Sequence, residues 1–309
     1  MLAIFLETLP FFALIALGYG AGRMRFFTAE ATAWLTKFVF YFALSAMLFR
    51  FAAQLSFSQF LNGPFLLAYL SGCLVVYGLA TAVALWRGVG MAQAAVEAQC
   101  AVIGNTGFLG VPMLVMLMGE GAVLPLVMVL AIDLLVFSTL IVILITASRE
   151  GRIRPSTLLR VLRGLLANPM IVSIALGLAW SAAGWAMPGP MEEFLTLLGN
   201  AATPGALFAI GASLAGKSAE RVSVASWLSV CKLLLHPAAV AVFALWVFPV
   251  ERYLAGIMIS AAALPVAGNV FMLAQHYGVA PARASAAILF STAASIVTLP
   301  AVIAWVSAR

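Results

Sequence analysis

Apolar residues run along this chain in long stretches, which short polar or turn-rich segments separate. Splitting the chain at those segments leaves ten stretches, and most of them approach the ~20 residues that a helix needs to cross a bilayer. Their bounds are 3–22, 29–50, 64–86, 92–118, 121–147, 168–187, 192–215, 223–248, 252–277 and 283–306. The pattern therefore predicts an all-α polytopic membrane protein with ten transmembrane helices.

Composition supports the same class of protein. Of the 309 residues, 65% are hydrophobic and only 8% are charged, whereas a soluble domain carries about 25% charged residues. Segments this apolar belong in a lipid bilayer, and we expect a multi-pass protein of the cell's inner (plasma) membrane.

The positive residues indicate how the chain is oriented in the membrane. If the N-terminus lies outside, 11 of the 16 Lys and Arg residues fall in the inside connections, 3 fall outside and 2 lie within spans. The positive-inside rule requires this asymmetry, which predicts that both termini lie outside. The net charge of +6 is spread along the chain without a basic patch, so we expect no nucleic-acid partner.

The longest connection, residues 148–168, is basic and divides the chain into two halves. We expect it to be a cytoplasmic linker with a short amphipathic helix around Arg160 and Arg163, lying on the anionic inner membrane surface. The halves, 1–147 and 169–309, hold five predicted spans each. Because this number is odd, homologous halves would be inserted in opposite directions, as a 5+5 inverted repeat.

Two of the predicted spans contain residues that interrupt a helix. The fourth span reads "GNTGFLGVP" over residues 104–112, and the ninth reads "AALPVAGNVF" over residues 262–271. At about 1.5 Å per residue, Asn105 lies ~18 Å and Pro265 ~20 Å into the membrane, near the midplane and approached from opposite faces. Irregular backbone at this depth must be buried in protein or line a wet cavity. We therefore predict that the fourth and ninth helices are broken and cross inside the protein.

Crossing broken helices can bind an anion. The N-terminus of a half-helix presents N–H groups without partners and a partial positive charge, which suit a carboxylate, and asparagine can donate and accept hydrogen bonds there. Proline and glycine are also common in membrane helices as kinks or packing points, but paired breaks in equivalent spans of inverted halves favour a site. The predicted substrate-binding residues are Asn105, Thr106, Gly107 and Pro112 in the first break and Pro265, Gly268 and Asn269 in the second.

A few other charged residues lie inside predicted spans. Asp133 is the only acid deep in a span, where a bare carboxylate costs about 2.5–3.5 kcal/mol. It is either a proton or cation coupling site, or else a neutral acid or a cap for a neighbouring broken helix. We expect Lys37 and Lys232 to extend their side chains toward the membrane surface; for Lys232 the alternative is a contact with a crossing helix. Glu97 can cap a helix or pair with Arg87, and we predict no role for it.

The histidines and cysteines show no metal-binding pattern. His236 and His276 stand alone, without a second ligand nearby, and the three cysteines Cys73, Cys100 and Cys231 lie in apolar runs without paired spacing. We therefore predict satisfied or interfacial histidines, buried hydrophobic cysteines, no metal site and no cofactor.

The motifs of four spans resemble those of the auxin efflux carrier family. They are "GNTGFLGVPM" in the fourth span, "TPGALFAIGASL" in the seventh, "KLLLHPAA" in the eighth and "ALPVAGNVFMLAQHYG" in the ninth. The resemblance covers nearly the whole chain, and the asparagine, glycine and proline residues predicted above match the two crossover motifs of the family. Because the chain lacks the long central loop of plant auxin exporters, it resembles the bacterial members described as malonate or malate permeases.

The resemblance implies a fold and a mechanism. The fold would be similar to that of bile-acid symporters and sodium/proton antiporters. Spans 1, 2, 6 and 7 would form a scaffold that can also make a homodimer, and spans 3–5 and 8–10 would form a moving domain whose crossover holds the substrate. Access would alternate by an elevator-like movement. Relatives usually have proline where this chain has Ser45, which leaves the bending of the second span open.

These features predict a secondary transporter for a small organic anion, a mono- or dicarboxylate. We do not expect an enzyme, because the chain lacks an H-E-x-x-H helix, a Gly-x-Ser-x-Gly elbow and a second deep carboxylate. The alternatives are a channel or a transporter-like sensor, which glycine-lined breaks would serve equally well, and a cation-coupled symporter of the bile-acid type.

Overall fold

The computed structural model describes residues 2–54, 62–150, 163, 166–216 and 222–308. Within these residues the fold is all-α, and the only extended pairing is one isolated antiparallel bridge. In the first half, where η marks a short 3-10 or π-helical turn, the helical segments are α1 Leu2–Arg23, α2 Ala29–Phe38, η1 Val39–Ala43, α3 Leu44–Ala53, α5 Gly63–Trp86, α6 Met91–Val102, η2 Thr106–Gly110, α7 Val111–Met118, η3 Glu120–Ala122, α8 Val123–Ile132, η4 Asp133–Phe137 and α9 Ser138–Glu150.

The second half is also helical throughout its described residues. Its segments are α11 Pro169–Ala182, α12 Gly189–Asn200, α13 Ala202–Ala215, α14 Val222–Val230, η5 Cys231–Leu235, α15 His236–Val242, η6 Phe243–Val247, α16 Arg252–Ala262, α17 Gly268–His276 and α18 Pro281–Ser307. Most of the basic connection 148–168, with its predicted amphipathic helix, lies outside the described residues.

Seven helices in the described part of the chain are long and apolar enough to cross a membrane. They cover Ile4–Arg23, Ala29–Ala53, Gly63–Trp86, Glu120–Arg149, Gly189–Ala215, Val222–Val247 and Pro281–Ser307, and each overlaps a predicted span. The other three predicted spans, 92–118, 168–187 and 252–277, are occupied by shorter helical pieces. Seven of the ten predicted spans therefore correspond to single helices that are long and apolar enough to cross a membrane.

Side chains and prolines define where several helices begin. Thr28 accepts a hydrogen bond from the backbone N–H of Ala31 at the start of α2, and Asn168 accepts one from Met170 at the start of α11. Asn62 caps α5 in the same way. Pro64 follows in the first turn of α5, where a backbone N–H would have no acceptor within the helix, so proline costs no hydrogen bond there. These polar residues satisfy donors that a helix leaves unpaired at its N-terminus.

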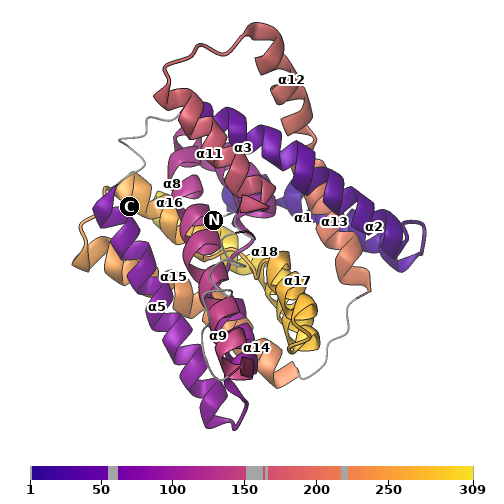
Figure 1. The fold of residues 1–309 in the computed structure, drawn as a ribbon, viewed down its shortest axis with the longest axis vertical. Helices are drawn as coiled ribbons and strands as arrows, with labels where there is room; N and C mark the ends of the chain where they lie inside the picture. Colours follow the sequence, from indigo (N-terminus) through magenta and orange to yellow (C-terminus); the bar gives the residue numbers. More distant parts are fainter. Residues whose placement is uncertain (1, 55–61, 151–162, 164–165, 217–221, 309) are drawn as a thin grey trace.

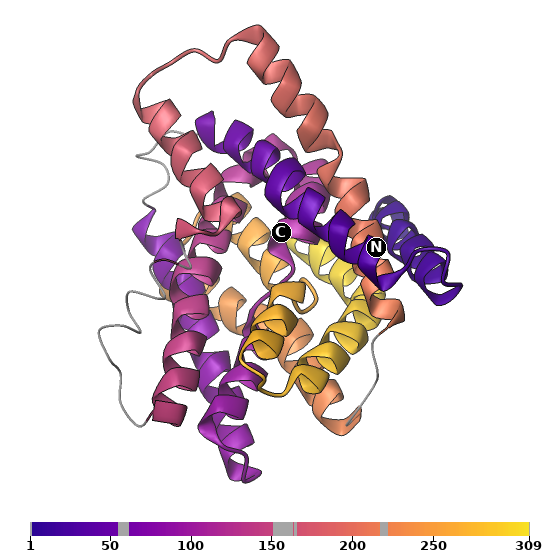
Figure 2. The same ribbon diagram turned by 45° about the vertical axis from the view of Figure 1, so that its right-hand side comes forward.

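The helices lie in two groups (Figures 1 and 2). In the upper right part of Figure 1, α1 packs on α13, α3 packs on α11 and α12, and α2 packs on α13. The second group, in the lower part, contains α5 against α6 and α15, α6 against α9, and α18 against α14, α16 and α17. The groups touch where α1 meets α18 and α7, where η2 meets α13 and where α8 meets α3. The bundle thus has an internal boundary that runs past η2.

Close packing between α1 and α13 depends on glycine. A Cβ added at Gly18 would lie 2.1 Å from the backbone oxygen of Phe208, and one added at Gly211 would lie 1.9 Å from the backbone oxygen of Ile15. Gly20, on the same helix α1, has no such neighbour within 4 Å. Only a residue without a side chain allows the two backbones to come this close, as is common where membrane helices pack.

The second predicted span deviates from α-helical geometry although Ser45 replaces the proline of the family. Residues Val39–Ala43 form a π-helical turn between α2 and α3, and the Ser45 hydroxyl donates to the backbone oxygen of Phe40, 3.1 Å away. A π-helical turn interrupts the regular i to i−4 hydrogen bonding, so this span has a local distortion without proline.

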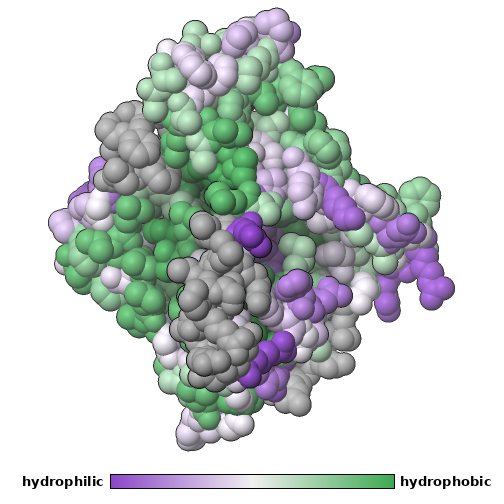
Figure 3. All heavy atoms as spheres, in the orientation of Figure 1, coloured by the Kyte–Doolittle hydropathy of each residue, from purple (hydrophilic) through white to green (hydrophobic). Residues whose placement is uncertain are grey.

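Apolar side chains cover much of the outer surface. Figure 3 shows hydrophobic residues over most of one face, with a hydrophilic group at the right-hand edge, where the turn between α1 and α2 projects. Large apolar side chains such as Leu197, Val297 and Trp246 are exposed by 79%, 70% and 67%. A surface of this kind is stable in contact with lipid tails rather than water.

Candidate functional site

Two irregular segments of the chain lie side by side in the interior. The first follows the end of α6 at Val102, and the second follows the end of α16 at Ala262. Gly104 and Val266 form the isolated antiparallel bridge that joins the two segments. The backbone N–H of Asn105 donates to the oxygen of Pro265 at 2.8 Å, and the N–H of Ala267 donates to the oxygen of Ile103 at 3.0 Å. Each segment thus satisfies backbone groups that the other leaves without a helical partner.

A helix begins directly after each of these segments. η2 begins at Thr106 and continues into α7 at Val111, and α17 begins at Gly268. The first N–H groups of a helix have no partner within it, and they give its N-terminus a partial positive charge. Because the two segments are bridged, two such N-termini lie near one another. Together they form a cradle that is suited to a small anion.

Polar side chains at the cradle have unused hydrogen-bonding capacity. The Thr106 hydroxyl and the Asn269 side-chain oxygen are buried and make no hydrogen bond to any described residue. The Asn105 side chain is also buried, at 6% exposed. Buried polar atoms in a native fold usually have a partner, so unpaired ones point to a missing water or ligand.

The glycines of the two segments differ in their surroundings. A Cβ at Gly107 would lie 2.6 Å from the Met170 methyl carbon, and one at Gly110 would lie 2.5 Å from a Leu264 methyl carbon. Both glycines therefore serve packing between helices. Gly268 has no heavy atom within 4 Å of its added Cβ and is exposed, so open space adjoins the N-terminus of α17.

The two prolines of the predicted site lie in different places. Pro265 is part of the bridged segment, where its oxygen accepts from Asn105. Pro112 is in the first turn of α7 and lines a separate cavity between α3, α7, α12 and α13. The structure therefore brings Asn105, Thr106, Pro265 and Asn269 to the bridged segments and places Pro112 beside them, on the boundary between the two helix groups.

A cluster of buried polar side chains lies next to the bridged segments. The Lys232 ammonium donates to the backbone oxygen of Ala262, at the C-terminal end of α16, and its Nζ lies 3.1 Å from His236 Nδ1. His236 Nε2 lies 3.2 Å from Cys73 Sγ. A Cβ at Gly104 would lie 3.3 Å from the Lys232 ammonium. A positive charge at this point stabilises the negative end of the α16 dipole.

The same cluster extends to Asp133. The Tyr69 hydroxyl donates to Asp133 Oδ1 at 3.0 Å, and Tyr69 lies one helical turn before Cys73 on α5. Asp133 Oδ2 is buried without a hydrogen-bond partner among the described residues. Asp133 begins the π-helical turn η4, and Lys232 lies in the π-helical turn η5. Such turns occur often at functional sites.

One expectation from the sequence, the one preferred for Lys232, is wrong here. Lys232 was expected to reach the membrane surface, but it is 0% exposed, because a backbone oxygen and His236 surround its ammonium. Cys73 is buried, as predicted, yet it contacts His236 rather than apolar atoms alone. The i, i+4 spacing of Tyr69 with Cys73 and of Lys232 with His236 was the available signal, since it places each pair on one helix face.

Lys37 differs from Lys232 in its surroundings. It is exposed, and its ammonium lies 4.2 Å from the centroid of the Trp34 ring. At this distance the cation is attracted to the face of the indole ring. Lys37 thus lies on the outer surface of α2, away from the bridged segments.

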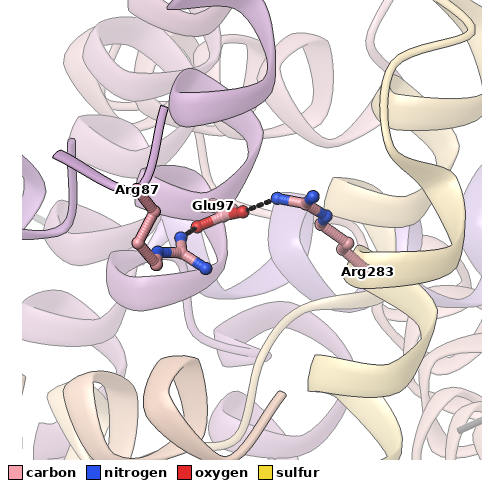
Figure 4. Close-up of polar contacts among 3 residues, drawn as sticks. All are labelled: Arg87, Glu97 and Arg283. Atoms are coloured by element: carbon pink, nitrogen blue, oxygen red, sulfur yellow. Dashed lines mark hydrogen bonds and ion pairs between the residues drawn. The ribbon is translucent and has the colours of Figure 1, made fainter. Parts of the chain in front are cut away.

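A buried ion-pair triad joins the two halves of the chain at one end of the bundle. Figure 4 shows Glu97 between Arg87 and Arg283, paired with both. Glu97 is 0% exposed, so the predicted pairing with Arg87 is confirmed. With its amide oriented to fit, the Gln93 oxygen also accepts from the Arg283 guanidinium. The triad connects the turn after α5 to α6 and to the first turn of α18.

An all-helical bundle with an apolar outer surface and two bridged irregular segments inside it has the features of a membrane transporter. The chain belongs to the family described as "Membrane transport protein", which it matches over residues 3–303. The predicted membership of the auxin efflux carrier family is confirmed by this match and by the relatives. The protein is therefore membrane-embedded, and its relatives are named as transporters and efflux carriers, not as enzymes.

Three relatives illustrate the family. A protein of Rhizobium meliloti (strain 1021) named "Putative malonate transporter" is 30% identical over 294 residues, which cover 94% of this chain and 92% of that protein. "Auxin efflux carrier component 8" of Arabidopsis thaliana is 22% identical over 360 residues, covering 96% of this chain and 95% of the relative. "Auxin efflux carrier component 3a" of Oryza sativa subsp. japonica is 34% identical over 145 residues, covering 43% of this chain and 22% of the relative.

Proposed function

We propose that this protein is a secondary transporter that carries a small organic anion, a mono- or dicarboxylate, across the cytoplasmic membrane by alternating access. The observation that carries the proposal is the bridge between the two irregular segments, which brings the N-termini of η2 and α17 together in the interior. Unpaired N–H groups and the side chains of Asn105, Thr106 and Asn269 would bind the carboxylate there. The name of the Rhizobium relative, "Putative malonate transporter", supports a substrate of this kind.

The proposed architecture has ten spans in a 5+5 inverted repeat. We count α6 with α7 and α16 with α17 as single interrupted spans, and α11 as the sixth span. The first repeat is 1–147, the second is 169–309, and 148–168 is the cytoplasmic linker. The positive-inside count supports an orientation with both termini outside. In this orientation the Glu97 triad lies on the cytoplasmic side.

Elevator-like movement is the proposed mechanism of alternating access. The scaffold would be the group α1, α2, α3, α11, α12 and α13, through which two copies can also associate as a homodimer. The remaining helices would form the moving domain, and the bridged segments lie inside it. The grouping of the helices supports this division, because the most extensive helix packing, such as α1 on α13 and α5 on α6, lies within each group. A substrate held at the bridged segments would then move with this domain.

Asp133 is the proposed coupling site for a proton or a cation. Its Oδ2 lacks a partner among the described residues, whereas its Oδ1 accepts from Tyr69. One elementary charge across 100 mV is worth about 2.3 kcal/mol, which corresponds to roughly fifty-fold in concentration. Export of an anion from an inside-negative cell therefore needs no coupling ion, whereas uptake against the potential does. A cation-coupled symporter of the bile-acid type is the alternative in which Asp133 is essential.

The test is counterflow in proteoliposomes. Saturable counterflow of a labelled carboxylate supports a carrier, whereas ohmic current without counterflow supports a channel, and binding without either supports a sensor. We expect Asn105→Ala and Asn269→Ala to lose most of the counterflow. Gln54→Ala removes an exposed amide far from the bridge in sequence and is the matched control. Full transport by folded Asn105→Ala and Asn269→Ala proteins would remove the bridged segments from the substrate site.

A further inference from the structure

A second feature of the molecule is a cavity with several polar residues in its lining. A cavity of about 310 Å³ lies between α3, α7, α12 and α13, on the boundary between the two helix groups. Its polar lining residues are Arg50, Thr196, Asn200 and Thr203, and Pro112 of α7 lines it as well. Volumes near 300 Å³ and above are typical of small-molecule sites. The cavity thus adjoins α7, which continues from the first bridged segment through η2.

Among the described residues that line the cavity, Arg50 is the only charged one, and it lies in the last turn of α3. It is half-buried and makes no hydrogen bond or ion pair with any described residue; its guanidinium lies 5.0 Å from the Phe51 ring centroid. By contrast, Arg87 and Arg283 share Glu97, and Arg149 donates to the backbone oxygen of Tyr277. Arg50 therefore has its donors available for a ligand inside the cavity.

The cavity residues from α12 and α13 supply neutral hydrogen-bond donors. Thr196 and Asn200 are four residues apart on α12, so they lie on one face of that helix, and Thr203 follows at the start of α13. Their hydroxyl and amide groups can donate to a carboxylate. The cavity thus combines a guanidinium on one wall with neutral donors on another.

We propose that this cavity is a binding site for a short dicarboxylate, on the pathway to the bridged segments. The inference rests on the proposed transport function and deepens it by naming the substrate class. Arg50 would bind one carboxylate through two parallel hydrogen bonds, a geometry that the planar guanidinium favours. Asn200 and the threonine hydroxyls would bind the second carboxylate. A monocarboxylate fills only one half of this arrangement, so the cavity selects for dicarboxylates.

Equilibrium binding of radiolabelled malonate and acetate to the purified full-length protein tests the site. We expect the wild type to bind malonate at least about tenfold more tightly than acetate, and Arg50→Gln to remove most of this preference by weakening malonate binding more than acetate binding. Arg50→Lys should weaken malonate binding to an intermediate degree, because an ammonium keeps the charge without the paired donors. Lys37→Gln removes one exposed positive charge outside the cavity and is the matched control.

A second variant keeps the test valid if Arg50→Gln folds poorly. Asn200 is exposed, so Asn200→Asp should leave the fold intact while placing a carboxylate against the ligand; we expect it to weaken malonate binding at least as strongly. Equal malonate affinity in the wild type, Arg50→Gln and Asn200→Asp overturns the site while leaving the proposed transporter in place. Equal losses of malonate and acetate binding overturn the dicarboxylate preference. If the wild type neither binds nor transports any carboxylate, the proposed function itself fails.

Discussion

Removing the charge of Glu97 should destabilise the fold more than most single substitutions. Glu97 is fully buried and neutralises two arginines, whose side chains are exposed by 29% for Arg87 and 7% for Arg283. In Glu97→Gln, the Arg87 guanidinium can still turn toward water, but the buried Arg283 guanidinium loses its counter-charge and keeps only neutral acceptors. Breaking a buried pair from one side costs about 3–5 kcal/mol.

We expect a loss at the lower end of that range, about 3 kcal/mol, because glutamine still accepts a hydrogen bond from Arg283. The free energy of unfolding can be measured by titrating the protein in mixed micelles with SDS. Glu193→Gln makes the same chemical change at an exposed position and should stay within about 0.5 kcal/mol of the wild type.

A double variant separates the charge effect from a general loss of packing. In Glu97→Gln with Arg283→Met, neither buried charge of that pair is left, and apolar replacements of buried pairs are often neutral or stabilising. The double variant should therefore recover most of the stability lost by Glu97→Gln. Two results would contradict this account of the triad. One is a Glu97→Gln variant that unfolds like the wild type. The other is a double variant that loses as much stability as the single variants Glu97→Gln and Arg283→Met lose together.

Three further predictions concern other parts of the molecule. Gly18→Ala should cost about 1–3 kcal/mol or more in SDS unfolding, because its Cβ would lie 2.1 Å from the Phe208 oxygen; Gly20→Ala is the control, and equal stability of the two variants would contradict the packing described. If Asp133 couples transport to protons, Asp133→Asn should flatten the dependence of transport on external pH, and an unchanged profile removes it from coupling. Lys232→Met should lower stability by about 1–3 kcal/mol, because a buried backbone oxygen loses its donor; a thermal midpoint in detergent equal to that of the wild type argues against this.

Parts of the fold were predictable because membrane spans obey a strong constraint. A helix that crosses lipid needs an uninterrupted apolar stretch, and seven such stretches are visible in the sequence and in the structure. The pairing of Glu97 with Arg87 was also predictable, since both residues lie near the same end of adjacent spans. The second partner, Arg283, is 186 residues from Glu97, and no local pattern indicates which helix packs there.

The polar cluster around Lys232 could not be predicted for the same reason. Helical spacing places Lys232 and His236 on one face and Tyr69 and Cys73 on another, but it does not indicate that these faces meet. Once they meet, burial is tolerated because the ammonium has a backbone oxygen and an imidazole as neighbours. The cavity at Arg50 is hidden from the sequence in the same way, since four helices form its walls.

The bridge between Asn105 and Pro265 has a consequence for the biosynthesis of the protein. The N–H of Asn105 finds its acceptor in a residue that is translated 160 positions later, as the two residue numbers give. At ribosomal rates of about 5–20 residues per second, this interval lasts ~8–32 s. During that time the first irregular segment is without its native partner in a membrane that offers few alternatives. The nascent first half is therefore the form of this protein that most needs the insertion machinery, and a chain truncated before Pro265 should be a substrate for membrane quality control.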